Sequence, residues 1–263
     1  MEKTQIKNRK DQKIVVVVSN PEKSSGLSFV MHGLGGFKEQ PHIQAFAKAF
    51  LDKNFTVVTF DTTNTYGESD GNYEDATTTN YYEDLEDVIK WAKTKKWYKE
   101  PFYLAGHSLG GISTALYAQK HPEEVKGLAP ISTVVSGSLS MEIMDPKIRE
   151  SWRETGWREQ PSESIPGLIK RLKWSHMEDR IKYDLLLEVE RLSMPVLLMV
   201  GDSDTSTPLE HQQMLYDVLP GDKEIHIFKG CDHNFREPAL EENIKKLYLL
   251  MSSWIEKVEG KNV

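Results

Sequence analysis

The sequence predicts an α/β fold in which a mainly parallel central sheet carries helices on both faces. Three observations support this prediction. Short apolar runs recur along the chain, and several are continuous rather than alternating, which is typical of strands buried on both faces of a sheet. Segments with helical spacing of apolar residues separate most of these runs. The repeated alternation of strand and helix favours parallel strands joined by right-handed crossovers.

The apolar runs give the expected strands in order along the chain. A hairpin is expected between residues 4–8 and 13–19, with its turn near residues 10–12. The other strands are expected at residues 27–31, 55–60, 101–104, 127–131, 195–200 and 224–228. Apolar residues at helical spacing predict amphipathic helices within residues 43–50, 82–92 and 244–258.

The alternation of predicted strands and helices is interrupted over residues 134–194. About 60 residues is too long for an ordinary connection. We therefore expect an inserted, mainly helical cap on a core formed by residues 1–133 and 195–263. Asp145, which is followed by a proline, predicts the start of a cap helix, and Gly156 predicts its end. A second helical region is expected after the Pro-Gly pair at residues 166–167. Extra helical packing on the flank of the sheet is the alternative interpretation.

The composition suits a large globular core and argues against several classes of protein. The chain has 263 residues, of which 38% are hydrophobic and 28% are charged. A single cysteine, Cys231, excludes an internal disulfide and a multi-cysteine zinc site. The formal net charge of −7 argues against nucleic-acid binding, which needs clustered cations. No apolar run is long enough for a membrane span, and the charged N-terminus does not resemble a signal peptide. We expect a cytoplasmic protein without integral membrane association.

The sequence Gly-His-Ser-Leu-Gly at residues 106–110 lies between an apolar strand and a helical segment. A serine at the tip of such a tight strand-to-helix turn is held in a strained backbone conformation. The entering strand and the leaving helix then approach so closely that only Gly106 and Gly110 fit. This arrangement would lift the hydroxyl of Ser108 above the sheet, at the N-terminus of the helix. Without this context, a serine flanked by glycines is as easily an ordinary turn.

A glycine-rich loop at residues 33–36 follows the strand at residues 27–31. Its backbone can point an N–H group at the space above Ser108, where a carbonyl oxygen that gains negative charge needs fixed donors. We expect these donors to be the backbone N–H groups of Leu34 and Leu109. A phosphate-binding loop is the alternative. The loop lacks the third glycine of a dinucleotide-binding motif, and the chain has no P-loop.

The acid and the base of a possible triad follow later in the chain. Asp202 and Asp204 lie in the loop after the strand at residues 195–200, at the edge where open α/β sheets place their sites. Either aspartate could instead only cap its own turn. His233 lies in a short loop after the last strand, whereas His226 lies inside that strand and is a less suitable base. The order of serine, aspartate and histidine is then complete.

These motifs resemble those of the α/β-hydrolase family, over residues from about 27 to 258. The resemblance implies an α/β-hydrolase fold and a triad of Ser108, Asp204 and His233. Asp204 is favoured because the acid of that family commonly lies three residues after the glycine that ends its strand, with Asp202 as the alternative. The stretch at residues 61–69 is similar to a family loop but lacks its first glycine. The inserted segment resembles the cap of small bacterial esterases, including cinnamoyl and feruloyl esterases and monoacylglycerol lipases.

The resemblance implies a serine carboxylic-ester hydrolase that acts through an acyl-enzyme on small or medium acyl or aryl-acyl esters. The same triad serves amide, thioester and carbon–carbon bond hydrolases, and a non-catalytic binding module on this scaffold is a more remote alternative. The expected partner is a small-molecule ester, and the sequence does not indicate the oligomeric state. No metal and no cofactor are expected, because the histidines show no ligand spacing. Cys231 is expected to be a packing residue.

Four residues of the inserted segment are candidates for an apolar or aromatic acyl pocket. They are Met144, Trp152, Trp157 and Trp174. The alternative is that they form the core of the segment itself, since aromatic residues at helical spacing usually serve packing.

Overall fold

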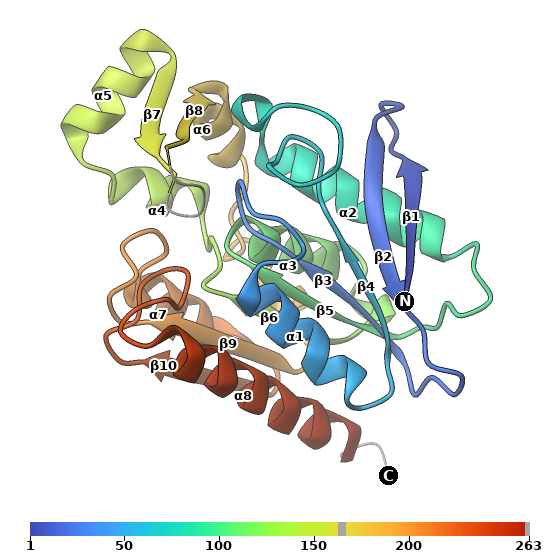
Figure 1. Ribbon diagram of the computed structural model, residues 1–263. Helices are drawn as coiled ribbons and strands as arrows, with labels where there is room; N and C mark the ends of the chain where they lie inside the picture. The colour runs from blue at the N-terminus through green and yellow to red at the C-terminus, as the bar shows by residue number, and fades with distance from the viewer. Residues whose placement is uncertain (163–166, 261–263) are drawn as a thin grey trace.

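The computed structural model describes residues 1–162 and 167–260, which form an eight-stranded sheet flanked by helices and a separate two-stranded hairpin (Figure 1). The strands are β1 (Glu2–Lys7), β2 (Lys13–Ser19), β3 (Leu27–Met31), β4 (Thr56–Phe60), β5 (Phe102–His107), β6 (Val125–Ile131), β7 (Trp157–Pro161), β8 (Ile169–Lys173), β9 (Val196–Gly201) and β10 (Lys223–Phe228). The α-helices are α1 (Pro41–Leu51), α2 (Thr78–Ala92), α3 (Leu109–Lys120), α4 (Gly137–Glu142), α5 (Pro146–Thr155), α6 (Ser175–Arg180), α7 (Leu209–Val218) and α8 (Leu240–Gly260). Short 3-10 helices are η1 (Tyr73–Asp75), η2 (Pro122–Glu124) and η3 (Val189–Arg191).

The strands of the large sheet follow the order β1-β2-β4-β3-β5-β6-β9-β10. The pairs from β4 to β10 are all parallel, whereas β2 is antiparallel to β4. β1 pairs with β2 in the predicted N-terminal hairpin. The prediction of a mainly parallel sheet is therefore confirmed, and the functional loops that follow parallel strands meet at one edge.

Alternate residues of the central strands pack into two apolar layers, one on each face of the sheet. On β5, Phe102 and Leu104 belong to one layer, while Tyr103 and Ala105 belong to the other. Helices α2, α3 and α7 contribute to the first layer, and α1 and α8 contribute to the second. This double burial explains why these strands are continuous apolar runs.

The predicted strands all form, with bounds that differ by a few residues. The predicted helical segments correspond to α1, α2 and α8, and the helix expected after Ser108 is α3. Helix α7 was not predicted from the sequence. Within the described ranges, none of the helices has both the length and the apolar character needed to cross a membrane.

Residues 134–194 hold α4, α5, the hairpin of β7 and β8, and α6, which gather together in Figure 1. The predicted ends of one helix are confirmed, because the Asp145 side chain caps the start of α5 and Gly156 ends it with φ +75°. The helical region expected after residues 166–167 is wrong in its first part, because β8 lies at residues 169–173 and α6 begins only at Ser175. The β7–β8 hairpin was not predicted, because its strands are rich in charged residues and largely lack buried apolar positions. The division of the chain into a core and a cap remains a prediction.

Trp152 packs inside this segment. Its side chain is only 2% exposed, and its ring lies edge-on to Trp174 with centroids 5.4 Å apart. It also stacks near His176, and its indole N–H donates a hydrogen bond of 2.9 Å to the carbonyl of Leu172. Trp152 therefore holds α5 against β8 and α6.

Candidate active site

Ser108 lies at the turn between β5 and α3, in a backbone conformation that L-residues rarely adopt. Its φ is +55° and its ψ is −115°. A Cβ on Gly106 would lie 2.3 Å from the carbonyl oxygen of Gly110, and a Cβ on Gly110 would lie 2.4 Å from the carbonyl oxygen of His32. The steric reason expected from the close approach of strand and helix is therefore confirmed for Gly106, whereas Gly110 is required by the neighbouring backbone at His32.

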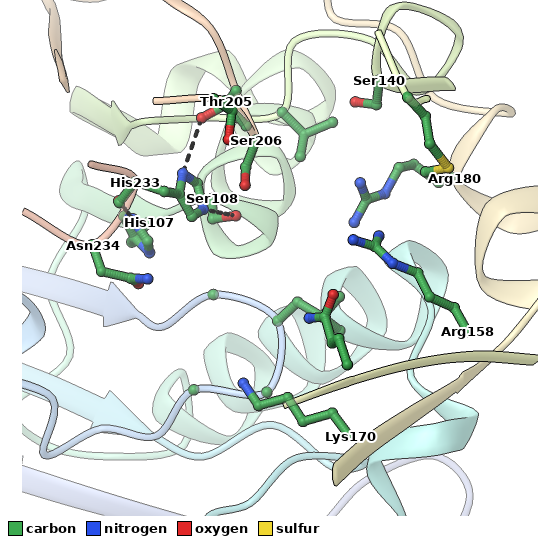
Figure 2. A pocket seen from close by; sticks show the side chains of 18 of the residues that line it. His107, Ser108, Ser140, Arg158, Lys170, Arg180, Thr205, Ser206, His233 and Asn234 are labelled. Atoms are coloured by element: carbon green, nitrogen blue, oxygen red, sulfur yellow. Dashed lines mark hydrogen bonds between the residues drawn. The ribbon is translucent and has the colours of Figure 1, made fainter. Parts of the chain in front are cut away.

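Three side chains from separate loops form a continuous series of hydrogen bonds. His233 Nε2 lies 2.9 Å from Ser108 Oγ, and His233 Nδ1 lies 2.8 Å from Asp204 Oδ2. Because a carboxylate can only accept, the imidazole donates from Nδ1, and its Nε2 is left to accept from the serine hydroxyl. Figure 2 shows Ser108 and His233 together at one side of the cavity.

Asp204 is buried and its carboxylate is held on both sides. Its Oδ1 accepts from the backbone N–H groups of Ser206 and Thr207 at 2.8 and 2.9 Å. Burial on its own would raise the pKa of Asp204, but the hydrogen bonds from His233 and Thr207 outweigh it and lower that pKa. Asp202 is exposed and accepts from the backbone N–H of Gly230 at 2.6 Å. The structure thus brings Asp204, and not Asp202, to the histidine.

Two supporting residues were missed by the sequence analysis. Thr207 Oγ1 lies 2.8 Å from Asp204 Oδ2 and 3.2 Å from His233 Nδ1. His107 is buried, and its Nε2 donates to the backbone carbonyl of His233 at 2.9 Å. Burial, followed by the neighbouring His42 and His233, holds the pKa of His107 well below its usual value, so the ring is neutral. The position of His107 inside the Gly-His-Ser-Leu-Gly sequence at residues 106–110 was the available signal for it.

The glycine-rich loop lies directly against Ser108. A Cβ on Gly33 would lie 3.0 Å from the Cβ of Ser108, which is tighter than an ordinary contact, so a side chain there would push against Ser108. The hydroxyl of Tyr81 accepts from the backbone N–H of Gly35 at 3.1 Å and fixes the loop. Leu34, the first expected donor, lines the same cavity as Ser108. Leu109, the second, is the first residue of α3, where a backbone N–H has no acceptor inside the helix.

The loop at residues 61–69 supports this region through a buried ion pair. Asp61 accepts from the backbone N–H and the Nζ of Lys38, at 2.8 and 2.7 Å. Gly67 lies so close that a Cβ there would be 2.3 Å from the Asp61 carboxyl carbon. The pair joins this loop to the chain just after the glycine-rich loop.

A cavity of about 470 Å³ opens over Ser108 and His233. Its apolar lining includes Leu34, Val134, Ile143, Met144 and Ile148. Three cations, Arg158, Lys170 and Arg180, also line it, and they come from the segment at residues 134–194 (Figure 2).

The cavity lining corrects part of the pocket expectation. Met144 lines the cavity as expected, whereas Trp152, Trp157 and Trp174 are not among its lining residues. Trp152 and Trp174 pack against each other inside the segment, and the Trp157 ring contacts the guanidinium of Arg171 at 4.4 Å. These aromatic rings contact other residues of the segment and do not line the cavity, which is the alternative that the sequence analysis left open.

Among the described residues, one group of three potential metal ligands lies close together, and it is at the other end of α3 from Ser108. His121, Glu123 and Glu124 offer ligand atoms within 4.8 Å of one another, at the far end of α3. The carboxylate of Glu124 is already engaged there, by Lys93 and by the hydroxyl of Tyr117. This group therefore has ordinary partners and no connection to the cavity.

The surroundings of Cys231 do not suit a second nucleophile. It is 1% exposed, and burial raises the pKa of its thiol. Its carbonyl lies so close to β9 that a Cβ on Gly201 would be 2.2 Å from it. Cys231 has the surroundings of a packing residue, because a buried thiol with a raised pKa is not reactive.

Comparison with known proteins places this chain in a family. A profile of the family described as serine aminopeptidase, S33 matches residues 22–168. An uncharacterised 31.7 kDa protein of Escherichia coli from the traX-finO intergenic region is 25% identical over 265 residues, which cover 88% of this chain and 90% of that protein. Lysophosphatidylserine lipase ABHD12 of Danio rerio is 24% identical over 201 residues, which cover 74% of this chain but only 48% of the lipase.

The structure of Est1E from Butyrivibrio proteoclasticus with bound ferulic acid has the same fold. It matches with a TM-score of 0.78 at 22% identity, over 96% of this chain and 99% of that one. The family profile covers more than half of the chain studied here. The chain therefore belongs to the serine aminopeptidase, S33 family of α/β hydrolases.

Proposed function

We propose that the chain is a serine hydrolase that cleaves carboxylic esters of small or medium acyl or aryl-acyl groups. One observation carries the proposal. The hydroxyl of Ser108, the imidazole of His233 and the carboxylate of Asp204 form an unbroken series of hydrogen bonds beside a cavity of about 470 Å³. A cavity of this size suits a small organic substrate.

The reaction follows from the direction of these hydrogen bonds. His233 Nε2 accepts the proton of Ser108 as the oxygen attacks the ester carbonyl, and the imidazolium then returns a proton to the leaving alcohol. Asp204 holds the ring in the tautomer that can accept and stabilises its positive charge. A water molecule, activated by the same histidine, then releases the acid from the acyl-enzyme.

The backbone N–H groups of Leu34 and Leu109 are the proposed donors to the oxyanion. Leu34 lines the same cavity as Ser108 and follows Gly33, which lies against Ser108. Leu109 comes directly after Ser108, at the start of α3. Loss of one such donor costs about 3 kcal/mol of transition-state stabilisation in serine hydrolases. Fixed backbone groups suit this role, because they need no reorganisation when charge develops.

The charges of the cavity favour an ester substrate over the free N-terminus that an aminopeptidase must bind. A protonated amine would need carboxylates, but among the described residues the lining contains a single acid, Asp145. The carboxylate of Asp145 accepts the backbone N–H groups of Lys147 and Ile148. The ferulic acid bound to Est1E and the lipase activity named for ABHD12 support the ester class.

A serine-directed fluorophosphonate and a chromogenic ester test this proposal. The protein should hydrolyse a short-chain nitrophenyl ester and should be labelled by the probe, and Ser108→Ala should lose both. Ser203→Ala is the matched control, because that serine is exposed and lies in the loop beside the acid. Equal labelling or equal turnover in Ser108→Ala would refute the assignment. An aminoacyl nitroanilide, assayed in parallel, decides between ester and aminopeptidase activity.

A further inference from the structure

Two arginines of the segment at residues 134–194 face the same cavity as Ser108. Arg158 lies on β7, and Arg180 is the last residue of α6. Figure 2 shows both guanidinium groups pointing into the cavity, on the side away from Ser108 and His233. Lys170, on β8, lines the cavity as well.

Arg158 and Arg180 have no acidic partner among residues 1–162 and 167–260. Arg158 contacts the ring of Trp152, with its guanidinium 5.6 Å from the ring centroid. The Nε of Arg180 is buried and has no hydrogen-bond partner in the part of the chain that is described. A buried guanidinium donor without an acceptor costs free energy, and an anionic ligand in the cavity would supply the missing acceptor.

Four other arginines of this chain each have a carboxylate at ion-pair distance. The pairs are Arg9 with Asp87, Arg153 with Glu150, Arg171 with Glu159 and Arg191 with Glu188. Arg149 instead donates to the backbone carbonyl of Met141. The chain carries 40 acidic against 33 basic residues, so carboxylates are in excess. Their absence around Arg158 and Arg180 is therefore a local feature of the cavity and does not reflect the composition.

The positive charges of the two guanidinium groups repel each other, which makes it less favourable to keep both of them charged in the cavity. Burial, and then the neighbouring charge of Arg158, lower the pKa of Arg180 to about 10, with Tyr73 acting in the opposite direction. Burial also lowers the pKa of Arg158. Both groups stay positive at neutral pH, so an anion placed between them would relieve desolvation and repulsion together. A planar fork of donors matches the oxygens of a carboxylate or a phosphate.

We propose that the substrate of this hydrolase carries an anionic group, a carboxylate or a phosphate, which Arg158 and Arg180 bind while the ester carbonyl lies at Ser108. This inference rests on the proposed function and adds the substrate class. The body of such a substrate would lie against apolar side chains of the lining, such as Ile143 and Met144. The predicted substrate is thus an ester that combines an apolar body with a negative charge remote from the cleaved bond.

The test compares esters that differ only in the remote charge. On the acyl side, mono-nitrophenyl esters of dicarboxylic acids from succinic to sebacic are paired with the same esters whose far carboxylate is capped as a methyl ester. On the alcohol side, monobutyrylglycerol is paired with its phosphate. The readout is the ratio of kcat/KM for the anionic ester to kcat/KM for its neutral partner.

We expect the wild-type ratio to exceed one by about tenfold or more in at least one series, since hydrogen bonds to a charged group are the stronger ones. Arg158→Gln and Arg180→Gln should each lower the ratio by about 10- to 100-fold. Arg180→Lys keeps the positive charge but loses the planar pair of donors, so its ratio should lie between those of the wild type and Arg180→Gln. Arg153→Gln is the matched control and should keep the wild-type ratio, because Arg153 is exposed on α5 and pairs with Glu150.

Calorimetry with adipate and with inorganic phosphate separates the anion site from catalysis. Binding to Ser108→Ala that is lost on adding Arg180→Gln supports the anion site, even if no ester is cleaved and the proposed function fails. If neutral esters are cleaved but every wild-type ratio is near one and neither anion binds, the anion site is refuted while the proposed function stands. A ratio unchanged in both arginine variants also overturns the inference, and the ratio does not depend on how much of a variant folds.

Discussion

Replacing Asp204 by Asn tests the geometry of the proposed triad most directly. The carboxylate uses its two oxygens for different partners. Oδ1 accepts two backbone N–H groups, from Ser206 and Thr207 at 2.8 and 2.9 Å, and Oδ2 faces Nδ1 of His233 at 2.8 Å. An asparagine has only one oxygen, so it can satisfy only one of these sides.

The two backbone N–H groups determine how the side-chain amide of the asparagine is oriented. If its NH2 group faced the two N–H groups, both would lose their acceptor, at a cost of about 1–3 kcal/mol each. The amide oxygen therefore takes the Oδ1 position and the NH2 group faces His233. Nδ1 must then accept, so the ring proton lies on Nε2 and points at Ser108. The imidazole cannot take the serine proton in this tautomer, and we expect Asp204→Asn to lower kcat by about 10³- to 10⁴-fold.

The assay measures kcat on the ester that the wild type cleaves best, together with the rate of fluorophosphonate labelling. Asp202→Asn is the matched control. Its carboxylate is exposed and accepts from Gly230, away from the imidazole, so kcat should stay within about twofold. A larger loss in Asp202→Asn than in Asp204→Asn, or more than a tenth of wild-type kcat in Asp204→Asn, would refute this reasoning.

Three further predictions concern the surroundings of the site. Gly106→Ala should destabilise the fold by about 3 kcal/mol in urea unfolding, because its Cβ would lie 2.3 Å from a backbone carbonyl oxygen. Gly260→Ala meets nothing within 4 Å and should leave the unfolding midpoint unchanged, so equal midpoints for the two variants would contradict the steric account. Thr207→Val should lower kcat by about tenfold, because the Thr207 hydroxyl contacts both Asp204 and the backbone carbonyl of Ser132. Thr207→Ser keeps the hydroxyl and should keep the wild-type kcat, and full activity in Thr207→Val would exclude a positioning role. The pKa of Asp204 is lowered on folding, so its ionised form stabilises the protein above the unfolded pKa of about 4, and this contribution is lost as the pH falls through the folded value. The difference in unfolding free energy between wild type and Asp204→Asn should therefore shrink below about pH 4, and a difference that does not change with pH would contradict the linkage.

The parts of the fold that the sequence predicted are those whose residues are buried on both faces. β3, β4, β5 and β9 are fully buried, and their apolar runs need no partner to be recognised. The β7–β8 hairpin has the opposite character, because its strands are polar and mostly exposed or half-buried. Its pairing depends on contacts that no periodicity reveals.

The same distinction holds within the candidate site. Ser108, Asp204 and His233 each follow a predicted strand, and the serine also lies in a strained turn that only glycine neighbours allow. Thr207 and His107 also support the site through hydrogen bonds to His233, which lies far away in the sequence. Long-range contacts of that kind leave no local pattern, so the motif that contains His107 did not by itself reveal the role of that residue.

The cations of the cavity show why selectivity is harder to predict than chemistry. The proposed catalytic groups come from the ends of parallel strands, where topology alone brings loops together. Arg158 and Arg180 come from a hairpin and a short helix that are ordinary charged segments in sequence, and the chain as a whole is acidic. Their proposed role is inferred from the three-dimensional structure, in which none of the described residues places a carboxylate within reach of either guanidinium. A net charge of −7 would repel an anionic substrate from the surface, so the preference for such a substrate must arise inside the cavity, where burial strengthens each contact.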